Sequence, residues 1–167
     1  MLDVGESAPG FFAKAYNNGA AGDFGLSDLE NKWKVMLFYV ADLSKVCPTE
    51  ILAFSQELDK FTASGAAVIG ISTDDVHTHE KFVKESKTPI KFPLIADDDG
   101  VVSSMYGVFD KNEKKARRAT FIIDNNGLIA YSCASNNKVG RSTKEIYRVL
   151  RALQSDGACA VNWEPSN

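Results

Sequence analysis

Residues 34–40 read Lys-Val-Met-Leu-Phe-Tyr-Val, and this almost unbroken apolar run is the part of the sequence that decides the fold class. Its length and its β-branched and aromatic content are typical of a strand buried on both faces of a sheet. A helix is predicted next, because Pro48 suits a first helical position and an apolar stripe follows at helical spacing, formed by Ile51, Phe54, Leu58 and Phe61. After a stop signal at Gly65, residues 66–71 are predicted to form a second buried strand.

A strand, a helix of about four turns and another strand make a βαβ unit, which normally implies a parallel pair with a right-handed crossover. Two further apolar runs, 121–124 and 128–131, flank Asn125-Asn126-Gly127, a turn signal that favours an antiparallel hairpin. The sequence therefore predicts an α/β fold with a central mixed sheet flanked by helices.

A last helix is predicted near the end of the chain. Ser142 and Glu145 have the spacing of a capping box, and an apolar stripe for the core follows them, formed by Ile146, Val149, Leu150 and Leu153. The residues after Gln154 are polar and too few for a domain. We therefore expect a single domain over residues 1–167 that includes a short C-terminal tail, 155–167.

Composition excludes several classes of function. The chain has 167 residues, of which 44% are hydrophobic and 25% are charged, which is enough for one sizeable core. A net charge of -3 leaves no basic surplus for nucleic acid or an anionic membrane. No apolar stretch approaches the roughly 20 residues of a membrane-spanning helix, and the N-terminal residues lack a signal-peptide pattern. A cytoplasmic location is expected.

Three cysteines are widely spaced, unlike the dense framework of a small secreted protein: Cys47, Cys133 and Cys159. In a reducing compartment such cysteines are buried, catalytic or redox-active. His77 and His79 raise the alternative of zinc, but no two cysteines have the short separation of structural zinc sites. Haem, flavin and nicotinamide fingerprints are also absent from the sequence. Neither a metal nor an organic cofactor is expected.

Cys47 has the most suggestive position of the three cysteines. Residues 42–50 join the first predicted strand to the helix, so Cys47 falls at the helix N-terminus. Unpaired backbone N–H groups and the positive end of the helix dipole favour an anion there. The carboxyl end of a parallel strand is also where open α/β sheets place their sites. On position alone, a catalytic thiol and a small buried hydrophobe both remain open.

A wider set of motifs occurs along nearly the whole chain and in a definite order: Val4-Gly5 with Ala8-Pro9, Phe38-Tyr39, Ser44, Val46-Cys47-Pro48-Thr49-Glu50, Phe92-Pro93-Leu94, Arg118 with Phe121-Ile122-Ile123-Asp124, and Gly140-Arg141-Ser142. Together they resemble the peroxiredoxin family. The late segment 150–163 resembles the alkyl hydroperoxide reductase C branch. The resemblance implies a thioredoxin-like fold and an enzyme that reduces hydrogen peroxide and organic hydroperoxides with a thiol.

The resemblance also assigns roles. Cys47 matches the cysteine whose thiolate attacks the peroxide, and Arg118 matches the arginine that stabilises the thiolate and the charge on the departing oxygen. Ser44 matches a hydroxyl residue that can donate to the peroxide. Read without the family, Arg118 would be a surface cation and Ser44 a loop serine.

Four residues match supporting positions around this set. Glu50 and Arg141 match a carboxylate and a second guanidinium that hold the first arginine in place, although a helix-capping Glu50 and a simple pre-helix Arg141 are alternatives. Pro48 follows the cysteine as in the family. Val40 stands where the family usually has proline and can still exclude water, while Lys45 replaces an aromatic residue.

The resemblance gives Cys159 the second half of the reaction. It matches the resolving cysteine, which condenses with the sulfenic acid of Cys47 to form a disulfide. In the typical two-cysteine class that cysteine comes from the other subunit, so a homodimer is implied, with a decamer also open. The resemblance further implies recycling by thioredoxin or a similar dithiol protein. Cys133, in or just after an apolar strand, is interpreted as structural.

An alternative function belongs to a different class. Members of this family form rings that act as holdase chaperones or relay oxidation to client proteins, and the departures at Val40 and Lys45 are compatible with weakened peroxidase activity. The presence of Ser44, Cys47, Arg118 and Cys159 together favours the enzyme, because a scaffold has no need of that set.

Overall fold

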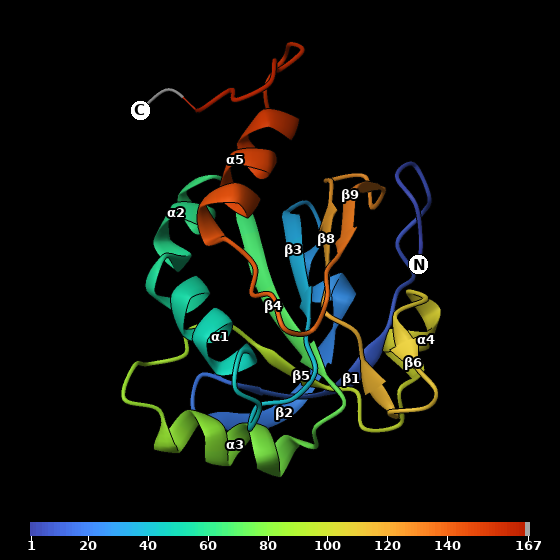
Figure 1. Ribbon diagram of the computed structural model, residues 1–167, viewed down its shortest axis with the longest axis vertical. Coiled ribbons are helices and arrows are strands. Elements are labelled where there is room, and N and C mark those ends of the chain that lie inside the picture. The colour runs from blue at the N-terminus through green and yellow to red at the C-terminus, as the bar shows by residue number, and fades with distance from the viewer. Residues whose placement is uncertain (166–167) are drawn as a thin grey trace.

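A seven-stranded mixed sheet with helices on both faces organises the computed structural model, which describes residues 1–165 (Figure 1). The strand order is β2-β1-β5-β4-β3-β8-β9. These strands are β1 (Phe12–Asn17), β2 (Ala20–Gly25), β3 (Trp33–Phe38), β4 (Ala66–Ser72), β5 (Leu94–Ala96), β8 (Ala119–Ile123) and β9 (Ile129–Ala134). The helices are α1 (Cys47–Gln56), α2 (Leu58–Ala63), α3 (Val76–Glu85), α4 (Val101–Met105) and α5 (Thr143–Leu153), with a short 3-10 helix η1 (Leu26–Leu29) and a separate hairpin of β6 (Phe109–Asp110) and β7 (Lys115–Ala116).

The predicted βαβ unit and mixed sheet are confirmed. β3 and β4 pair in parallel, from Trp33 opposite Ala66 to Phe38 opposite Ile71, and β8 lies antiparallel on the other side of β3. Within the described residues, no helix is long and apolar enough to cross a membrane.

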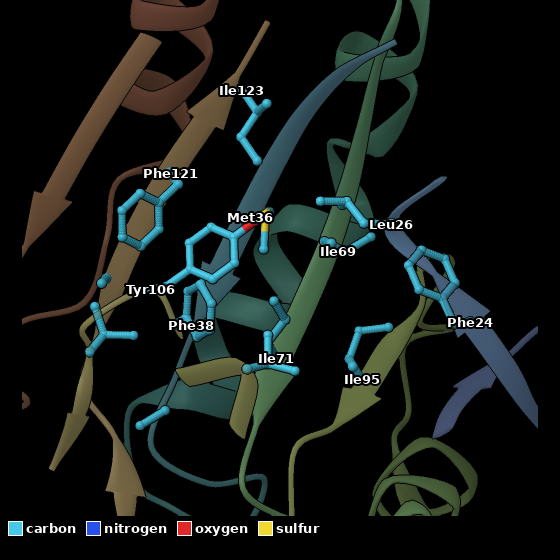
Figure 2. Close-up of a cluster of buried hydrophobic side chains, with 14 of the residues drawn as sticks. Phe24, Leu26, Met36, Phe38, Ile69, Ile71, Ile95, Tyr106, Phe121 and Ile123 are labelled. Atoms are coloured by element: carbon cyan, nitrogen blue, oxygen red, sulfur yellow. The ribbon is translucent and has the colours of Figure 1, made fainter. Parts of the chain in front are cut away.

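β3 is apolar on both faces because each face packs into its own core. Successive strand side chains point to opposite sides. Val35 and Leu37 join a cluster with residues of α1, α2 and α5. Met36 and Phe38 join the second cluster, which Figure 2 shows together with Tyr106. The rings of Phe38 and Tyr106 are tilted by 44°, with centroids 5.3 Å apart. The near-continuous apolar run is thus the signature of a central strand covered on both faces.

The prediction of a single helix of about four turns after Cys47 is wrong in one respect. The helix is interrupted at Glu57, where φ is -98° and ψ is 6°, well away from helical ψ. α1 therefore ends at Gln56 and α2 begins at Leu58. Phe54 and Phe61 are nevertheless both fully buried, with ring centroids 5.7 Å apart, so the predicted apolar stripe still faces the core.

The predicted hairpin joins β8 to β9, which is an edge strand of the sheet. Gly127 has φ of +81°, a conformation that glycine adopts without steric cost. The carboxylate of Asp124 accepts from the backbone N–H of Asn126 at 2.9 Å and of Leu128 at 2.8 Å. An Asx-type turn of this kind sets the register of the two strands.

The last helix, α5, begins as predicted at a capping serine. The hydroxyl of Ser142 accepts from the backbone N–H of Glu145 at 3.2 Å. Only this half of the predicted capping box forms, because the Glu145 carboxylate instead accepts from Arg148 at 2.7 and 2.8 Å. Ile146 and Leu150 are buried against the sheet.

Candidate active site

Cys47 is the first residue of α1 and lies beyond the carboxyl end of β3. Its side chain is fully buried. Its backbone N–H donates to the hydroxyl oxygen of Ser44 at 3.2 Å, and Pro48 occupies the first turn, where a missing N–H costs nothing. The sulfur therefore lies at the positive end of the helix dipole, close to backbone N–H groups that interact favourably with negative charge.

Arg118 reaches the cysteine because of strand register. β8 pairs antiparallel with β3 so that Ala119 lies opposite Phe38, which places Arg118 at the strand end that leads to the Cys47 loop. The arginine is 1% exposed, and its Nη2 donates to Cys47 Sγ at 3.3 Å. A buried guanidinium beside sulfur stabilises negative charge there and can donate to an oxygen that approaches it.

Glu50 lies between two arginines. From the first turn of α1 it accepts from Arg118 Nη1 at 3.0 Å and from Arg141 Nε at 2.9 Å and Nη2 at 3.2 Å. The Arg141 backbone N–H adds a bond of 2.7 Å, and its Nη1 donates to the carbonyl of Ala119 at 2.9 Å. All three charged side chains are nearly inaccessible to solvent. Such a network fixes the orientation of the Arg118 guanidinium.

Asn137 also holds Arg118 in place, although the sequence did not identify it as a site residue. Its backbone carbonyl accepts from Arg118 Nη2 at 3.2 Å, and its side-chain oxygen accepts from the Arg118 backbone N–H at 3.3 Å. It lies in the loop between β9 and α5, close before the Gly140-Arg141-Ser142 motif, which is the one signal that pointed to this loop. Among the described residues, Arg118 Nε is buried and lacks a hydrogen-bond partner.

A buried polar chain supports the loop that carries Cys47. Tyr39 donates its hydroxyl to Asp42 Oδ1 at 2.7 Å, and the other oxygen of Asp42 lies 2.6 Å from His79 Nδ1. The pKa of Tyr39 is raised well above its ordinary value, first by burial and then by the Asp42 carboxylate, so the phenol remains a donor. His79, which raised the alternative of zinc in the sequence, thus connects the loop to α3.

A hollow of about 280 Å³ lies over this arrangement. Its lining comes from the loop before Cys47, from the start of β8 and from the loop before α5, and consists of Val40, Ser44, Lys45, Val46, Arg118, Asn137 and Lys138. Cys47 is not part of the lining, but it contacts two lining residues, Ser44 and Arg118. The predicted residues Val40, Ser44 and Arg118 are therefore brought together at one concave surface.

Cys159 is not brought to Cys47 within the chain, and both thiols are free. Cys159 follows α5 and is half-buried; its sulfur lies 3.8 Å from the carbonyl of Ala152 and 3.2 Å from the hydroxyl of Ser155. Farther along, Arg148 Nη1 donates to the carbonyl of Trp163 at 3.4 Å, so the tail returns along the helix. The last two residues of the predicted tail 155–167 lie outside the described residues.

Cys133 departs from its interpretation as a structural cysteine. It lies in β9, as the sequence suggested, but its side chain is exposed. The reason is topological, since β9 is an edge strand and one side of it has no neighbouring strand among the described residues.

Comparison with known proteins gives a consistent result. Residues 4–132 match the model of the AhpC/TSA family. The protein YkuU of Bacillus subtilis (strain 168) is 41% identical over 97% of this chain and 94% of its own length. A thioredoxin peroxidase of Fasciola hepatica is 34% identical over 100% of this chain and 91% of its own. The reduced 2-Cys peroxiredoxin of Plasmodium vivax superposes with a TM-score of 0.92 and 31% identity, covering 98% of this chain and 90% of that one.

Proposed function

The chain belongs to the AhpC/TSA family, the peroxiredoxins, and we propose that it reduces hydrogen peroxide and organic hydroperoxides by attack of the Cys47 thiolate on the O–O bond. The family makes the protein an enzyme of the thiol peroxidase class with a thioredoxin-like fold.

In the first step, Cys47 Sγ attacks the terminal peroxide oxygen as the O–O bond breaks. Sulfur gains an S–O bond and becomes a sulfenic acid, while the other oxygen leaves with the bonding electrons and takes up a proton, as water or an alcohol. Negative charge therefore moves from sulfur to the departing oxygen. Arg118 can stabilise both charges without reorganising, because Glu50 and the Asn137 carbonyl already hold its guanidinium.

One observation carries this proposal: Arg118 Nη2 lies 3.3 Å from Cys47 Sγ while Nη1 of the same guanidinium is bound to Glu50 at 3.0 Å. A cysteine that served only as core packing would have no need of a cation beside its sulfur, and burying that cation requires the paired carboxylate of Glu50. Ser44 adds a hydroxyl beside the backbone of Cys47.

In the second step, the Cys159 thiol of another subunit attacks the sulfenic acid, forms a disulfide with Cys47 and releases water. This assignment is supported by the two thiols being free and lying on different elements of one chain, Cys47 at the start of α1 and Cys159 after the end of α5. A homodimer follows from the proposal, with a decamer as a larger assembly. Thioredoxin or a similar dithiol protein then reduces the disulfide by thiol exchange.

The test is peroxide consumption by the purified protein with thioredoxin, thioredoxin reductase and NADPH. Cys47→Ser should abolish turnover, because a hydroxyl offers almost no oxyanion at neutral pH. Cys133→Ser is the matched control: it removes an exposed thiol outside the site and should leave turnover within about twofold of the unmodified protein, as for ordinary surface substitutions. Continued turnover by Cys47→Ser would overturn the proposal. If the unmodified protein itself consumed no peroxide, the chaperone or redox-relay role would be favoured instead.

A further inference from the structure

Two lysines line the hollow over the proposed active site. Lys45 lies on the loop before α1, and Lys138 lies on the loop between β9 and α5, so segments far apart in the sequence bring them to one concavity. Both are exposed. Within residues 1–165, the salt bridges of the chain involve other cations, and neither ammonium group has a carboxylate within 4.0 Å.

Among the residues that the structure describes, none of those lining the hollow is acidic and could balance these charges. Its lining includes three cationic residues, Lys45, Lys138 and Arg118. The nearest acid of the network, Glu50, is buried below the site and already shared between Arg118 and Arg141. The chain as a whole has a net charge of -3, so the positive charge around this hollow is a local feature. A concavity of one sign with low-dielectric walls concentrates ligands of opposite charge.

The rest of the wall combines two valines with the polar residues Ser44 and Asn137. Val40 and Val46 face the hollow, and lysine stems contribute methylene groups while their ammonium groups stay in water. A neutral, fully hydrated peroxide would use neither the valines nor the ammonium groups. A molecule with an apolar skeleton, a hydroperoxide at one end and an anion at the other would use both.

We propose that Lys45 and Lys138 make this enzyme selective for organic hydroperoxides that carry a carboxylate. The inference rests on the proposed function, since the hydroperoxide still reacts at Cys47 by the step given above. The carboxylate takes no part in bond making and stays at the opening of the hollow, where the two ammonium groups attract it. This attraction orients the O–O bond toward Arg118 and the sulfur.

The experiment compares two hydroperoxides of the same skeleton by stopped flow: cumene hydroperoxide, which is neutral, and its 4-carboxy derivative, which is anionic. The readout is the ratio of the two second-order rate constants for oxidation of Cys47. In the unmodified protein the ratio should favour the carboxylate by roughly 10-fold at low ionic strength, within the range for electrostatic focusing, and should shrink at about 500 mM salt.

The double variant K45Q/K138Q should bring the ratio close to one, and K45E/K138E should bring it below one. Lys87→Gln is the matched control, because Lys87 is an exposed lysine that does not line the hollow, and it should keep the ratio of the unmodified protein. An equal ratio in the unmodified protein and K45Q/K138Q would overturn the selectivity. Failure of every variant and of the unmodified protein to react with either peroxide would instead overturn the proposed function.

Discussion

The Arg118 guanidinium lies 3.3 Å from the sulfur of Cys47, although 71 residues separate the two in the chain. Cys47 begins a helix and Arg118 precedes a strand, so neither local element brings them together. The contact depends on the register between β3 and β8 and on the Glu50 carboxylate that holds the guanidinium from below.

Arg118→Ala should slow the oxidation of Cys47 by roughly 100-fold or more, the loss expected when one preorganised donor is deleted from a catalytic site. Stopped-flow fluorescence with hydrogen peroxide measures the rate. Arg118→Lys should recover only part of it, because one ammonium group cannot contact Glu50 and the sulfur with the fixed fork of a guanidinium. A rate in Arg118→Ala equal to that of the unmodified protein would make Arg118 a purely structural cation.

Glu50→Gln should lower the free energy of unfolding and should also slow the oxidation of Cys47 by peroxide. The change leaves two buried guanidinium groups without a counter-charge, and breaking a buried ion pair from one side costs about 3–5 kcal/mol. Urea unfolding measures the loss of stability. The rate of Cys47 oxidation by hydrogen peroxide measures how far Arg118 has lost its position.

Glu57→Gln is the control for that measurement. Glu57 pairs with Lys60 at the surface, where such pairs contribute about 0–1 kcal/mol, so both readouts should change little. Equal urea midpoints for the two variants would show that the Glu50 network contributes nothing to the fold.

Cys159→Ser should permit one round of peroxide reduction and then stop. The sulfenic acid still forms on Cys47, but the variant has no resolving thiol, so thioredoxin-supported turnover is lost while a single stoichiometric burst remains. The unmodified protein after peroxide treatment should run as a disulfide-linked dimer on a non-reducing gel, and Cys159→Ser should run as a monomer. A monomeric oxidised band of the unmodified protein with an internal disulfide would place both cysteines in one subunit.

Ser142→Ala should lower the free energy of unfolding by about 1 kcal/mol, because it removes the hydroxyl that caps the first turn of α5. Ser142→Thr retains a capping hydroxyl and should retain most of the stability. Urea midpoints of the three proteins provide the comparison. If Ser142→Ala and Ser142→Thr had the same midpoint, the cap would be shown not to stabilise the helix.

Local patterns of the sequence were sufficient to predict the main elements. Residues 34–40 and 66–71 were identified as strands because a strand covered on both faces must be apolar at nearly every position. The turn was identified from Asn125-Asn126-Gly127, and the cap from the spacing of Ser142 and Glu145. Both features rest on bonds between a side chain and backbone groups two to four residues away. The interruption at Glu57 was missed, since the apolar spacing continues through it.

The residues of the active site were predicted from two other signals. Position at a helix N-terminus singled out Cys47, and resemblance to a family singled out Arg118, Glu50 and Arg141. Nothing local pointed to Asn137 or Lys138, because a polar loop residue has the same sequence appearance whether it faces solvent alone or borders a site. Likewise, the apolar run beside Cys133 suggested burial, but exposure of that residue depends on β9 being an edge strand.

The sequence alone therefore determined β3, β4, β8, β9, α5 and the helical segment after Cys47, and it placed that thiol at a helix N-terminus. Each of these depends on neighbours within a few residues. Only the tertiary structure decided which charges surround that thiol. The distances among Cys47, Arg118 and Glu50, and the meeting of Lys45 with Lys138, are set by how β8 pairs with β3 and how the loop before α5 closes over α1. Such contacts join residues about 70 to 90 positions apart, beyond the reach of any local periodicity.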